Sequence, residues 1–179
     1  MNRKRRLTER ITDSSYVEDL SDKSIEELRS MREECSEGEN EVSFERRLCQ
    51  ARIDILSAEL SRREGDEQGD LVSRLPEILG GGLTQPSEAP LPDRAPDFSI
   101  PRNADVPRRR IEEIVGEETL ARLQEIEPDE IRDIIRSIGD HERNLSEKRK
   151  DIHEVMDLIQ GEIVRRYTSG EADPTAALR

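Results

Sequence analysis

The sequence predicts an all-α protein in which two long helices form a coiled-coil hairpin and are joined by a long linker with short extra helices. Three observations lead to this prediction. Apolar residues recur every seven positions in two separate segments, which is the pattern of a coiled-coil seam. Hydrophobic residues make up only 32% of the 179 residues and aromatic residues 2%, which is too little for a large globular core. Most of the nine prolines fall between the two segments.

Residues 1–22 are expected to form a flexible basic tail. They mix Arg, Lys, Ser and Asp with scattered apolar residues, so they lack the periodicity of a packed helix. The cluster from Arg3 to Arg6 has two interpretations: a solvated basic terminus, which we favour, or a group that contacts a nucleic acid.

The first long helix is expected within residues 23–64. Ser24 followed by Glu27 resembles a capping box, which predicts a helix start near Ser24. Gly38 interrupts this helix at a cost of about 1 kcal/mol relative to Ala. It indicates either a local bend or a close approach of a ligand to the backbone. The seam residues of this segment are Leu28, Cys35, Val42, Cys49 and Leu56.

A linker with little regular structure is expected over residues 65–107, where the periodicity disappears and three consecutive glycines follow Leu79. Its length does not decide whether the two long helices run parallel or antiparallel. Within it, Leu71–Leu79 is more apolar than its surroundings. This stretch is either a patch that packs back on the helices or a short anchor that docks into a partner.

Residues 108–168 are expected to contain short helices followed by the second long helix. Apolar residues at helical spacing are broken near Gly116, which predicts two short helices before Ile126. Pro128 fits the first turn of the long helix, and residues 169–179 are expected to be disordered. The seam residues of this segment are Ile131, Ile138, Leu145, Ile152 and Ile159.

A five-residue polar motif lies on the first long helix and returns on the second. Its members are four, three, four and four residues apart, so at about 100° per residue they fall within an arc of roughly 80° on one helical stripe. The second copy follows at an offset of 103 residues (142 − 39 = 103), and flanking positions keep the same offset. The sequence therefore predicts an internal repeat. The motif residues are Glu39, Ser43, Arg46, Gln50 and Asp54 in the first copy and Glu142, Ser146, Arg149, His153 and Asp157 in the second.

In both copies Glu and Arg replace apolar residues in the second seam column. A charge in a seam costs several kcal/mol unless it is paired or hydrated. One interpretation is an internal salt-bridge layer that sets the register of the helices. That layer does not explain why Ser, Gln or His, and Asp extend the stripe. A guanine nucleotide with an anionic backbone explains them, because Arg pairs with guanine or phosphate, a carboxylate accepts from guanine, and Ser and Gln donate hydrogen bonds.

Composition argues against several other classes of function. The net charge of −13 opposes general binding to nucleic-acid phosphates, and no helix carries a contiguous basic stretch, so no direct DNA binding is expected. No apolar run approaches the roughly 18 residues of a membrane span, so we expect no membrane contact and a cytoplasmic location. Cys35 and Cys49 are about 21 Å apart by helical rise and are expected to be reduced. Because the sequence has no metal-ligand cluster, Gly-rich phosphate loop or nucleophile–base pair, neither a metal site nor an enzyme is expected.

The doubled pattern Glu-x3-Ser-x2-Arg-x3-Gln-x3-Asp resembles the cyclic di-GMP signature of the RsiG family, actinobacterial anti-sigma factors of the sporulation sigma factor WhiG. The first copy fits in full, whereas His153 stands where the second copy should have Gln. The resemblance covers residues 24–63 and 108–167, and it includes Leu71–Leu79 and the terminal RYTSGEA stretch. Because a neutral His still donates or accepts one hydrogen bond, we expect binding to be retained and to be pH-sensitive near pH 6.5.

This resemblance implies an antiparallel hairpin, a dimer of two cyclic di-GMP molecules as the ligand, and sequestration of a WhiG-type sigma factor from RNA polymerase in the liganded state, which blocks transcription of late sporulation genes. The alternative function is a coiled-coil scaffold or adaptor that binds no nucleotide. Glu39, Gln50, Glu142 and His153 are expected to contact the ligand or to orient the arginines. The remaining expected roles are guanine edges or phosphates for Arg46 and Arg149, the Watson–Crick edge of guanine for Asp54 and Asp157, and phosphate for Ser43 and Ser146.

Overall fold

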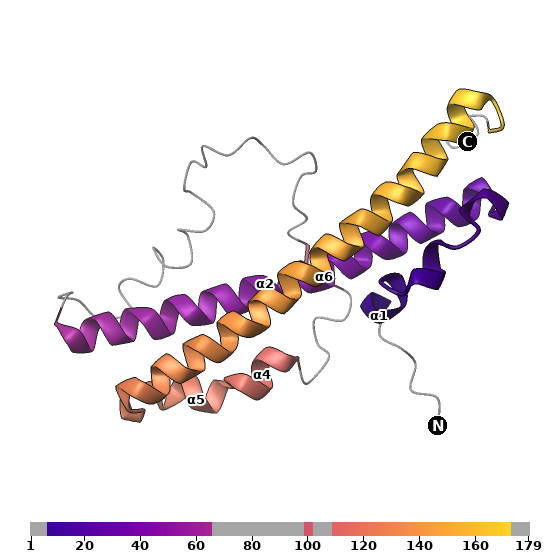
Figure 1. Cartoon of the computed structure of the whole chain (residues 1–179). Coiled ribbons are helices and arrows are strands. Elements are labelled where there is room, and N and C mark those ends of the chain that lie inside the picture. The colour runs from indigo at the N-terminus through magenta and orange to yellow at the C-terminus, as the bar shows by residue number, and fades with distance from the viewer. Residues whose placement is uncertain (1–6, 66–98, 102–108, 173–179) are drawn as a thin grey trace, which may run out of the picture. The chain divides into compact units, whose positions relative to one another are not determined.

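The computed structural model describes residues 7–65, 99–101 and 109–172, and within these ranges every regular element is a helix (Figure 1). Two of them are long: α2 spans Ile25–Glu64 and α6 spans Pro128–Ser169. The predicted fold class, all-α with two long helices, is confirmed. The shorter elements are α1 (Leu7–Ile11), the 3-10 helices η1 (Ser14–Val17) and η2 (Leu20–Asp22), α4 (Arg110–Ile114), α5 (Glu117–Ala121) and the 3-10 helix η3 (Leu123–Glu125).

The chain divides into two compact units. Among the described residues, the first unit contains 7–43 and 146–172, and the second contains 44–65, 99–101 and 109–145. Each unit therefore holds one part of α2 and one part of α6. We describe the two units separately.

Within each unit the two helical segments run antiparallel. In the first unit Arg29 hydrogen-bonds Tyr167, whereas Arg32, further along α2, bonds the earlier residue Gln160 of α6. In the second unit Arg46 pairs with Glu142, and Glu64 pairs with Arg132. The partner's number falls as the number on α2 rises, which is the signature of antiparallel pairing. The arrangement that linker length left undecided is therefore antiparallel.

The predicted seam forms the core of both units. All ten seam residues are buried, and none exposes more than 5% of its surface. Burying each Leu or Ile side chain contributes roughly 1.5–3 kcal/mol, so this column is the main source of stability. The set comprises Leu28, Cys35, Val42, Cys49 and Leu56 on α2 and Ile131, Ile138, Leu145, Ile152 and Ile159 on α6.

The predicted starts of both long helices are confirmed. The backbone N–H of Ser24 donates to Glu27 Oε2 at 2.7 Å, and the backbone N–H of Glu27 donates to Ser24 Oγ at 3.2 Å. These reciprocal bonds are a capping box, and they satisfy amide groups that the first turn of α2 would leave unpaired. The backbone hydrogen bond from Ser24 also lowers the pKa of Glu27. At the start of α6, Pro128 occupies the first helical position.

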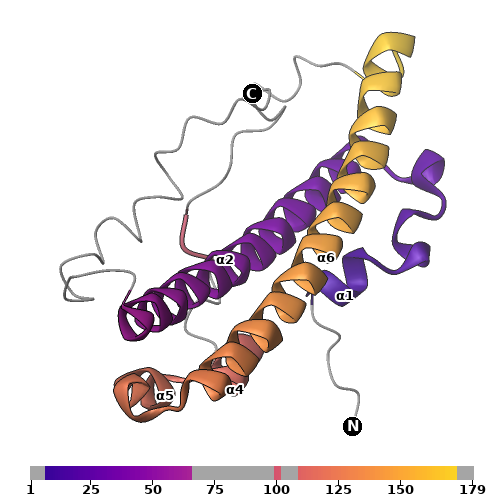
Figure 2. The same cartoon turned by 60° about the vertical axis from the view of Figure 1, so that its left-hand side comes forward.

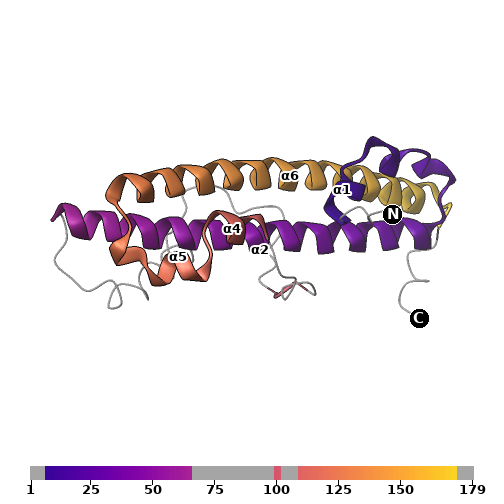
Figure 3. The same ribbon diagram turned by 90° about the horizontal axis from the view of Figure 1, so that it is seen from below.

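The expectation of a flexible tail is wrong for residues 7–22. These residues form α1, η1 and η2, and α1 lies against the long helices of the first unit (Figure 3). Ile11 of α1 is fully buried, and Tyr16 donates its hydroxyl hydrogen to Glu34 Oε2 on α2 at 2.8 Å. A few buried side chains hold this segment, although its sequence shows no long-range periodicity.

Gly38 lies within α2 without breaking the helix, and a side chain of the protein approaches it closely. The helix continues through it, and the close approach is made by α1. A Cβ atom at this position would lie 2.8 Å from Ile11 Cδ1, which is closer than real side chains allow. The glycine therefore makes room for Ile11 to pack against the seam beside Ile152.

The second unit contains the two short helices predicted on either side of Gly116. Helices α4 and α5 lie beside the first turns of α6 (Figure 2). Ile111 and Val115 are fully buried, and Arg52 of α2 donates to the carbonyl oxygen of Val115 at 2.7 Å. The segment before α6 is thus packed against both long helices of its unit.

The internal repeat extends over these short segments. Adding 103 to the bounds of α1 gives the bounds of α4 (7 + 103 = 110 and 11 + 103 = 114), and adding 103 to those of η2 gives those of η3. Each half of the described chain therefore has four elements in the same order: a short α-helix, a one-turn element (η1 or α5, which begin 103 residues apart), a 3-10 helix and a long helix. The sequence predicted the repeat only for the long helices.

Several predictions lie outside the described residues. These concern the basic cluster Arg3–Arg6, nearly all of the linker, the apolar stretch Leu71–Leu79, and most of the tail after residue 169. In the described part of the chain, no helix is long and apolar enough to cross a membrane.

Candidate functional site

The first unit contains one charged layer of the repeated motif, formed by Glu39 and Ser43 of α2 with Arg149 of α6. Arg149 Nε donates to Glu39 Oε1 at 2.7 Å, and Ser43 Oγ donates to the same oxygen at 2.6 Å. The side chain of Glu39 is 15% exposed and that of Arg149 is 34% exposed. The carboxylate is thus held in the seam, whereas the guanidinium reaches the surface.

The Glu39 carboxylate remains ionised at neutral pH. Burial alone would raise its pKa, but the hydrogen bonds from Ser43 and Arg149 outweigh burial and hold the pKa below its usual value. A buried carboxylate with charge-assisted donors is a firm anchor for an arginine. Glu39 therefore fixes the direction of Arg149 before any ligand arrives.

The other motif residues of the first unit are Ser146, His153 and Asp157, all on α6. His153 Nε2 lies 3.7 Å from Glu39 Oε1, so the imidazole is a third group beside this carboxylate. Ser146 is half-buried and Asp157 is exposed to solvent. The three residues follow the stripe predicted from their spacing, and His153 lies beside the Glu39–Arg149 layer.

The second unit contains the equivalent layer, formed by Arg46 of α2 and Glu142 of α6. Arg46 Nε donates to Glu142 Oε1 at 2.5 Å, and the two side chains are 31% and 20% exposed. Gln50 and Asp54 are both exposed on α2. Partial desolvation raises the pKa of Asp54.

The ion pairs are crossed between the two copies of the motif. Glu39 of the first copy pairs with Arg149 of the second, and Glu142 of the second pairs with Arg46 of the first. Adding 103 to Glu39 gives Glu142 and adding 103 to Arg46 gives Arg149, so the two layers are equivalent. The salt-bridge layer considered from the sequence is therefore present in both units.

Both arginines are engaged through Nε, and about one third of each side chain is exposed. A guanidinium held in this way still has an Nη1–Nη2 edge suited to a planar pair of acceptors, such as guanine O6 and N7 or two phosphate oxygens. Asp54 and Asp157 are exposed carboxylates about two helical turns beyond Arg46 and Arg149, and a carboxylate can accept from the N1 and N2 hydrogens of guanine. The chemistry of each unit fits an anionic guanine nucleotide.

A second pair of equivalent arginines holds the short segments and was missed by the sequence analysis. Arg166 donates to the carbonyl oxygens of Leu20, Ser21 and Lys23 in the first unit, and Arg63 donates to those of Leu123 and Ile126 in the second. Glu162 and Glu59 in turn accept hydrogen bonds from Arg166 and Arg63. We call these the carbonyl clamps. The sequence feature that could have indicated these clamps is the Glu-x2-Arg-Arg pattern, which occurs at 59–63 and again at 162–166.

His141 and Glu45 form a further pair in the second unit. His141 Nε2 lies 2.8 Å from Glu45 Oε1, and the two side chains are only 14% and 15% exposed. Glu45 Oε1 also lies 3.5 Å from the backbone nitrogen of Ile111 at the start of α4. No sequence signal pointed to this pair, because the counterpart of His141 in the first copy is Gly38 (38 + 103 = 141).

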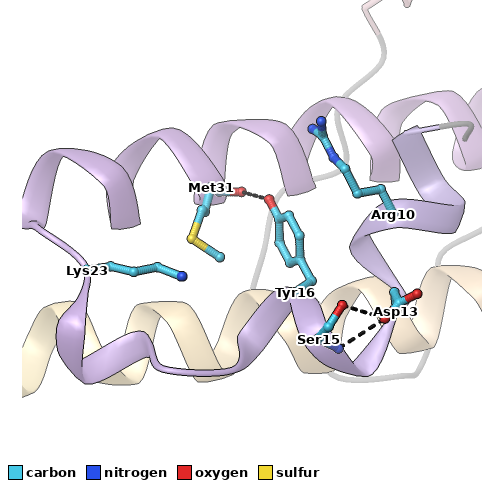
Figure 4. A pocket seen from close by; sticks show the side chains of 6 residues that line it. All are labelled: Arg10, Asp13, Ser15, Tyr16, Lys23 and Met31. Carbon is cyan, nitrogen blue, oxygen red and sulfur yellow. Dashed lines mark hydrogen bonds between the residues drawn. The ribbon is translucent and has the colours of Figure 1, made fainter. Parts of the chain in front are cut away.

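A surface pocket of about 330 Å³ lies in the first unit between the N-terminal segment and α2 (Figure 4). Its polar groups are largely used within the protein: Asp13 accepts two hydrogen bonds from Ser15, and Arg10 pairs with Glu34 at 2.7 Å. Desolvation and the hydrogen bond to Glu34 raise the pKa of Tyr16. No motif residue lines this pocket, and its lining residues are Arg10, Asp13, Ser15, Tyr16, Lys23 and Met31. Among the described residues, no group of His, Cys, Asp and Glu could hold a metal ion.

Comparison with protein families gives a match that spans most of the described chain. The model of a family described as RsiG-like matches residues 14–79 and 117–179. These ranges together exceed half of the chain and include all ten motif positions. A search of curated proteins finds no match.

Proposed function

Because the chain belongs to the RsiG-like family, we propose that it is an anti-sigma factor that binds a dimer of cyclic di-GMP and in that state sequesters a WhiG-type sporulation sigma factor. Such sequestration blocks transcription of late sporulation genes. The family supports a regulatory role rather than an enzymatic one. The single observation that carries the ligand proposal is the pair of equivalent, crossed Arg–Glu layers at the centre of the doubled motif.

The geometry supports the proposal through the state of the two arginines. Arg46 and Arg149 are oriented by carboxylates and are partly exposed. Pre-orientation lowers the entropy that an arginine loses when it binds a ligand. In the proposed complex the guanidinium groups pair with guanine edges or phosphates, Asp54 and Asp157 accept from guanine, and Ser43 and Ser146 donate to phosphate.

Charge explains why the ligand would act as a switch. A buried or half-buried ion pair gains little stability over apolar side chains, because desolvation offsets the attraction. Each cyclic di-GMP molecule carries two phosphate charges, so a dimer supplies four negative charges to the arginines. Binding then stabilises the paired helices by mass action and fixes the surface that the sigma factor recognises.

The decisive test is calorimetric titration of the protein with cyclic di-GMP beside a variant carrying Arg46→Ala and Arg149→Ala. We expect saturable binding of two nucleotides per chain in the parent protein. Each bidentate arginine contact contributes about 1–3 kcal/mol, or roughly 5- to 150-fold in affinity, so the double variant should lose measurable binding.

Arg136→Ala is the matched control for this titration. Arg136 lies on the exposed surface of α6, outside the motif, and pairs with Asp133, three residues away, at 2.7 Å. The control variant should therefore bind cyclic di-GMP like the parent. Equal loss in Arg136→Ala, or unchanged binding in the double variant, would contradict the assignment of Arg46 and Arg149.

Binding of the sigma factor is tested separately by size-exclusion chromatography of the protein with a purified WhiG-type sigma factor. A stable complex should form with cyclic di-GMP present and dissociate without it. If the complex forms equally well with and without cyclic di-GMP, the anti-sigma role stands, but its control by cyclic di-GMP is rejected.

A scaffold is the second candidate function, and one observation favours it. Each Arg–Glu layer is an ion pair between the protein's own two long helices, as a device that only sets register requires. This function predicts no heat of binding in the same titration at tens of micromolar nucleotide, even with the sigma factor present.

A further inference from the structure

The two charged layers differ in one motif position, and that difference places a histidine beside the first layer only. Gln50 of the first copy is exposed on α2, whereas its counterpart His153 (50 + 103 = 153) is half-buried on α6. His153 Nε2 lies 3.7 Å from Glu39 Oε1, the same oxygen that accepts from Arg149 and Ser43. An amide cannot change its charge, but an imidazole gains a proton near physiological pH.

Charged groups lie near His153 on its own helix and on α2. On α6, Lys150 pairs with Glu154 at 3.7 Å, and Arg149 and Asp157 lie one turn to either side of His153. From α2, the facing carboxylate is that of Glu39.

The helix α1 meets this region with apolar side-chain atoms. It contacts the neighbouring Gly38–Ile152 region with the apolar groups of Ile11 and Thr8. Its Arg10 is paired with Glu34, and its Glu9 is exposed.

We propose that His153 makes nucleotide binding at the first layer proton-dependent: protonated His153 pairs with the Glu39 carboxylate, which still orients Arg149, and adds a positive charge to the site that receives the anionic ligand. This inference rests on the proposed function, because it concerns regulation of the same site. His153 acts in it through the net charge of the first layer.

The direction of the effect follows from charge. With neutral His153, the charges of Arg149 and Glu39 cancel, so the layer is neutral. With protonated His153 the layer carries one positive charge, which attracts phosphate. The protonated form therefore binds the ligand more tightly, and by linkage the ligand increases proton uptake by His153. Glu39 stays ionised over this range because its pKa lies below its usual value.

The test is calorimetric titration with cyclic di-GMP at several pH values between 6 and 8, using the full chain. We expect affinity about 3- to 10-fold higher at pH 6 than at pH 8, because a protonated imidazole adds one positive charge to the site. Titration near pH 7 in buffers of different ionisation enthalpy should show uptake of a fraction of a proton per chain.

Two variants assign the effect. His153→Gln restores the residue of the first motif copy, so it should bind cyclic di-GMP at every pH but lose the pH dependence and the proton uptake. His141→Gln changes the other of the two histidines in the chain, and this variant should keep the pH dependence and the proton uptake. If His153 had a purely structural role, the parent protein and His153→Gln would take up the same number of protons on binding.

The outcomes separate this inference from the proposed function. Absence of binding at every pH in the parent protein would reject the proposed function itself. Binding that is equally tight at pH 6 and pH 8, or a pH dependence that persists in His153→Gln or disappears in His141→Gln, would overturn the role of His153 while leaving nucleotide binding intact.

Discussion

Arg166 shows how a single side chain ties a short segment to the long helices. It is buried, and it donates to the carbonyl oxygens of Leu20, Ser21 and Lys23 while its Nε bonds Glu162. A 3-10 helix leaves carbonyl groups without partners at its end, and a guanidinium supplies enough donors to satisfy several at once. Arg63 does the same in the second unit.

We predict that Arg166→Ala destabilises the protein much more than Arg165→Ala. Loss of Arg166 removes the hydrogen bonds to the carbonyl oxygens of Leu20, Ser21 and Lys23 together, at a cost of about 2–4 kcal/mol. Arg165 pairs with Glu162 and Glu171 at the exposed surface, where ion pairs contribute little. Guanidinium denaturation of the two variants measures the difference, and equal midpoints would show that the carbonyl clamp is not important for stability.

The acidic partner of the second clamp predicts a pH dependence. Hydrogen bonds from Arg62 and Arg63 lower the pKa of Glu59 to about 2, although burial opposes this shift. A carboxylate whose pKa is lower in the folded state stabilises the fold above its unfolded pKa of about 4.5, and this stabilisation is lost as the pH falls toward 2.

We therefore expect Glu59→Gln to flatten the acid side of the stability profile. Thermal unfolding at pH 6, 5, 4 and 3 should show a parent protein that loses stability faster than the variant on acidification. The difference between the two proteins isolates Glu59 from the other carboxylates. Parallel profiles would mean that the Glu59 ion pairs do not contribute to the acid sensitivity.

The two long helices contain glycines with different surroundings. Gly38 of α2 is covered by Ile11 of α1, whereas a Cβ at Gly139 of α6 would have no neighbour within 4 Å. The cost of glycine in a helix is the same in both places, but only Gly38 obtains packing in return. Comparing substitutions at the two glycines therefore distinguishes the effect of helix propensity on stability from the effect of the packing of α1 on Gly38.

We predict that Gly139→Ala raises the free energy of unfolding by about 0.5–1 kcal/mol, because Ala has the higher helix propensity. Gly38→Ala should gain less or lose stability, because Ile11 has to move, and amide exchange in α1 should accelerate. Chemical denaturation and hydrogen exchange measure both effects. An equal gain in the two variants would contradict the docking of α1 on Gly38.

The long helices could be predicted from the sequence because their signals are local. The heptad spacing of residues such as Leu28 and Ile131 and the Ser24–Glu27 capping box are visible in short windows, and all were confirmed. The segment 7–22 could not be predicted. A five-residue helix such as α1 is unstable alone and forms only because Ile11 finds a buried position in the first unit.

For the molecule as a whole, the motif could be predicted as two stripes, but the partners within it could not. The spacing placed Glu39 and Arg149 on helical stripes, whereas their pairing depends on the antiparallel register, which the linker length does not determine. The 103-residue repeat was predicted from the long helices. That the repeat includes α1 and α4 could not be predicted, because the equivalent positions Gly38 and His141 differ. Gly38 leaves space for Ile11 of α1, whereas His141 pairs with Glu45, which lies beside the start of α4.

The carbonyl clamps have a consequence for how the protein is made. All residues of the second unit lie between 44 and 145, so Arg63 can find Leu123 and Ile126 before synthesis of the chain reaches the end of α6. In the first unit, the contact between Leu20 and Arg166 cannot form until the ribosome has added Arg166, 146 residues after Leu20. Chains emerge from their N-terminus and fold as partners become available. The part of the protein that is translated first is therefore the part that finishes folding last.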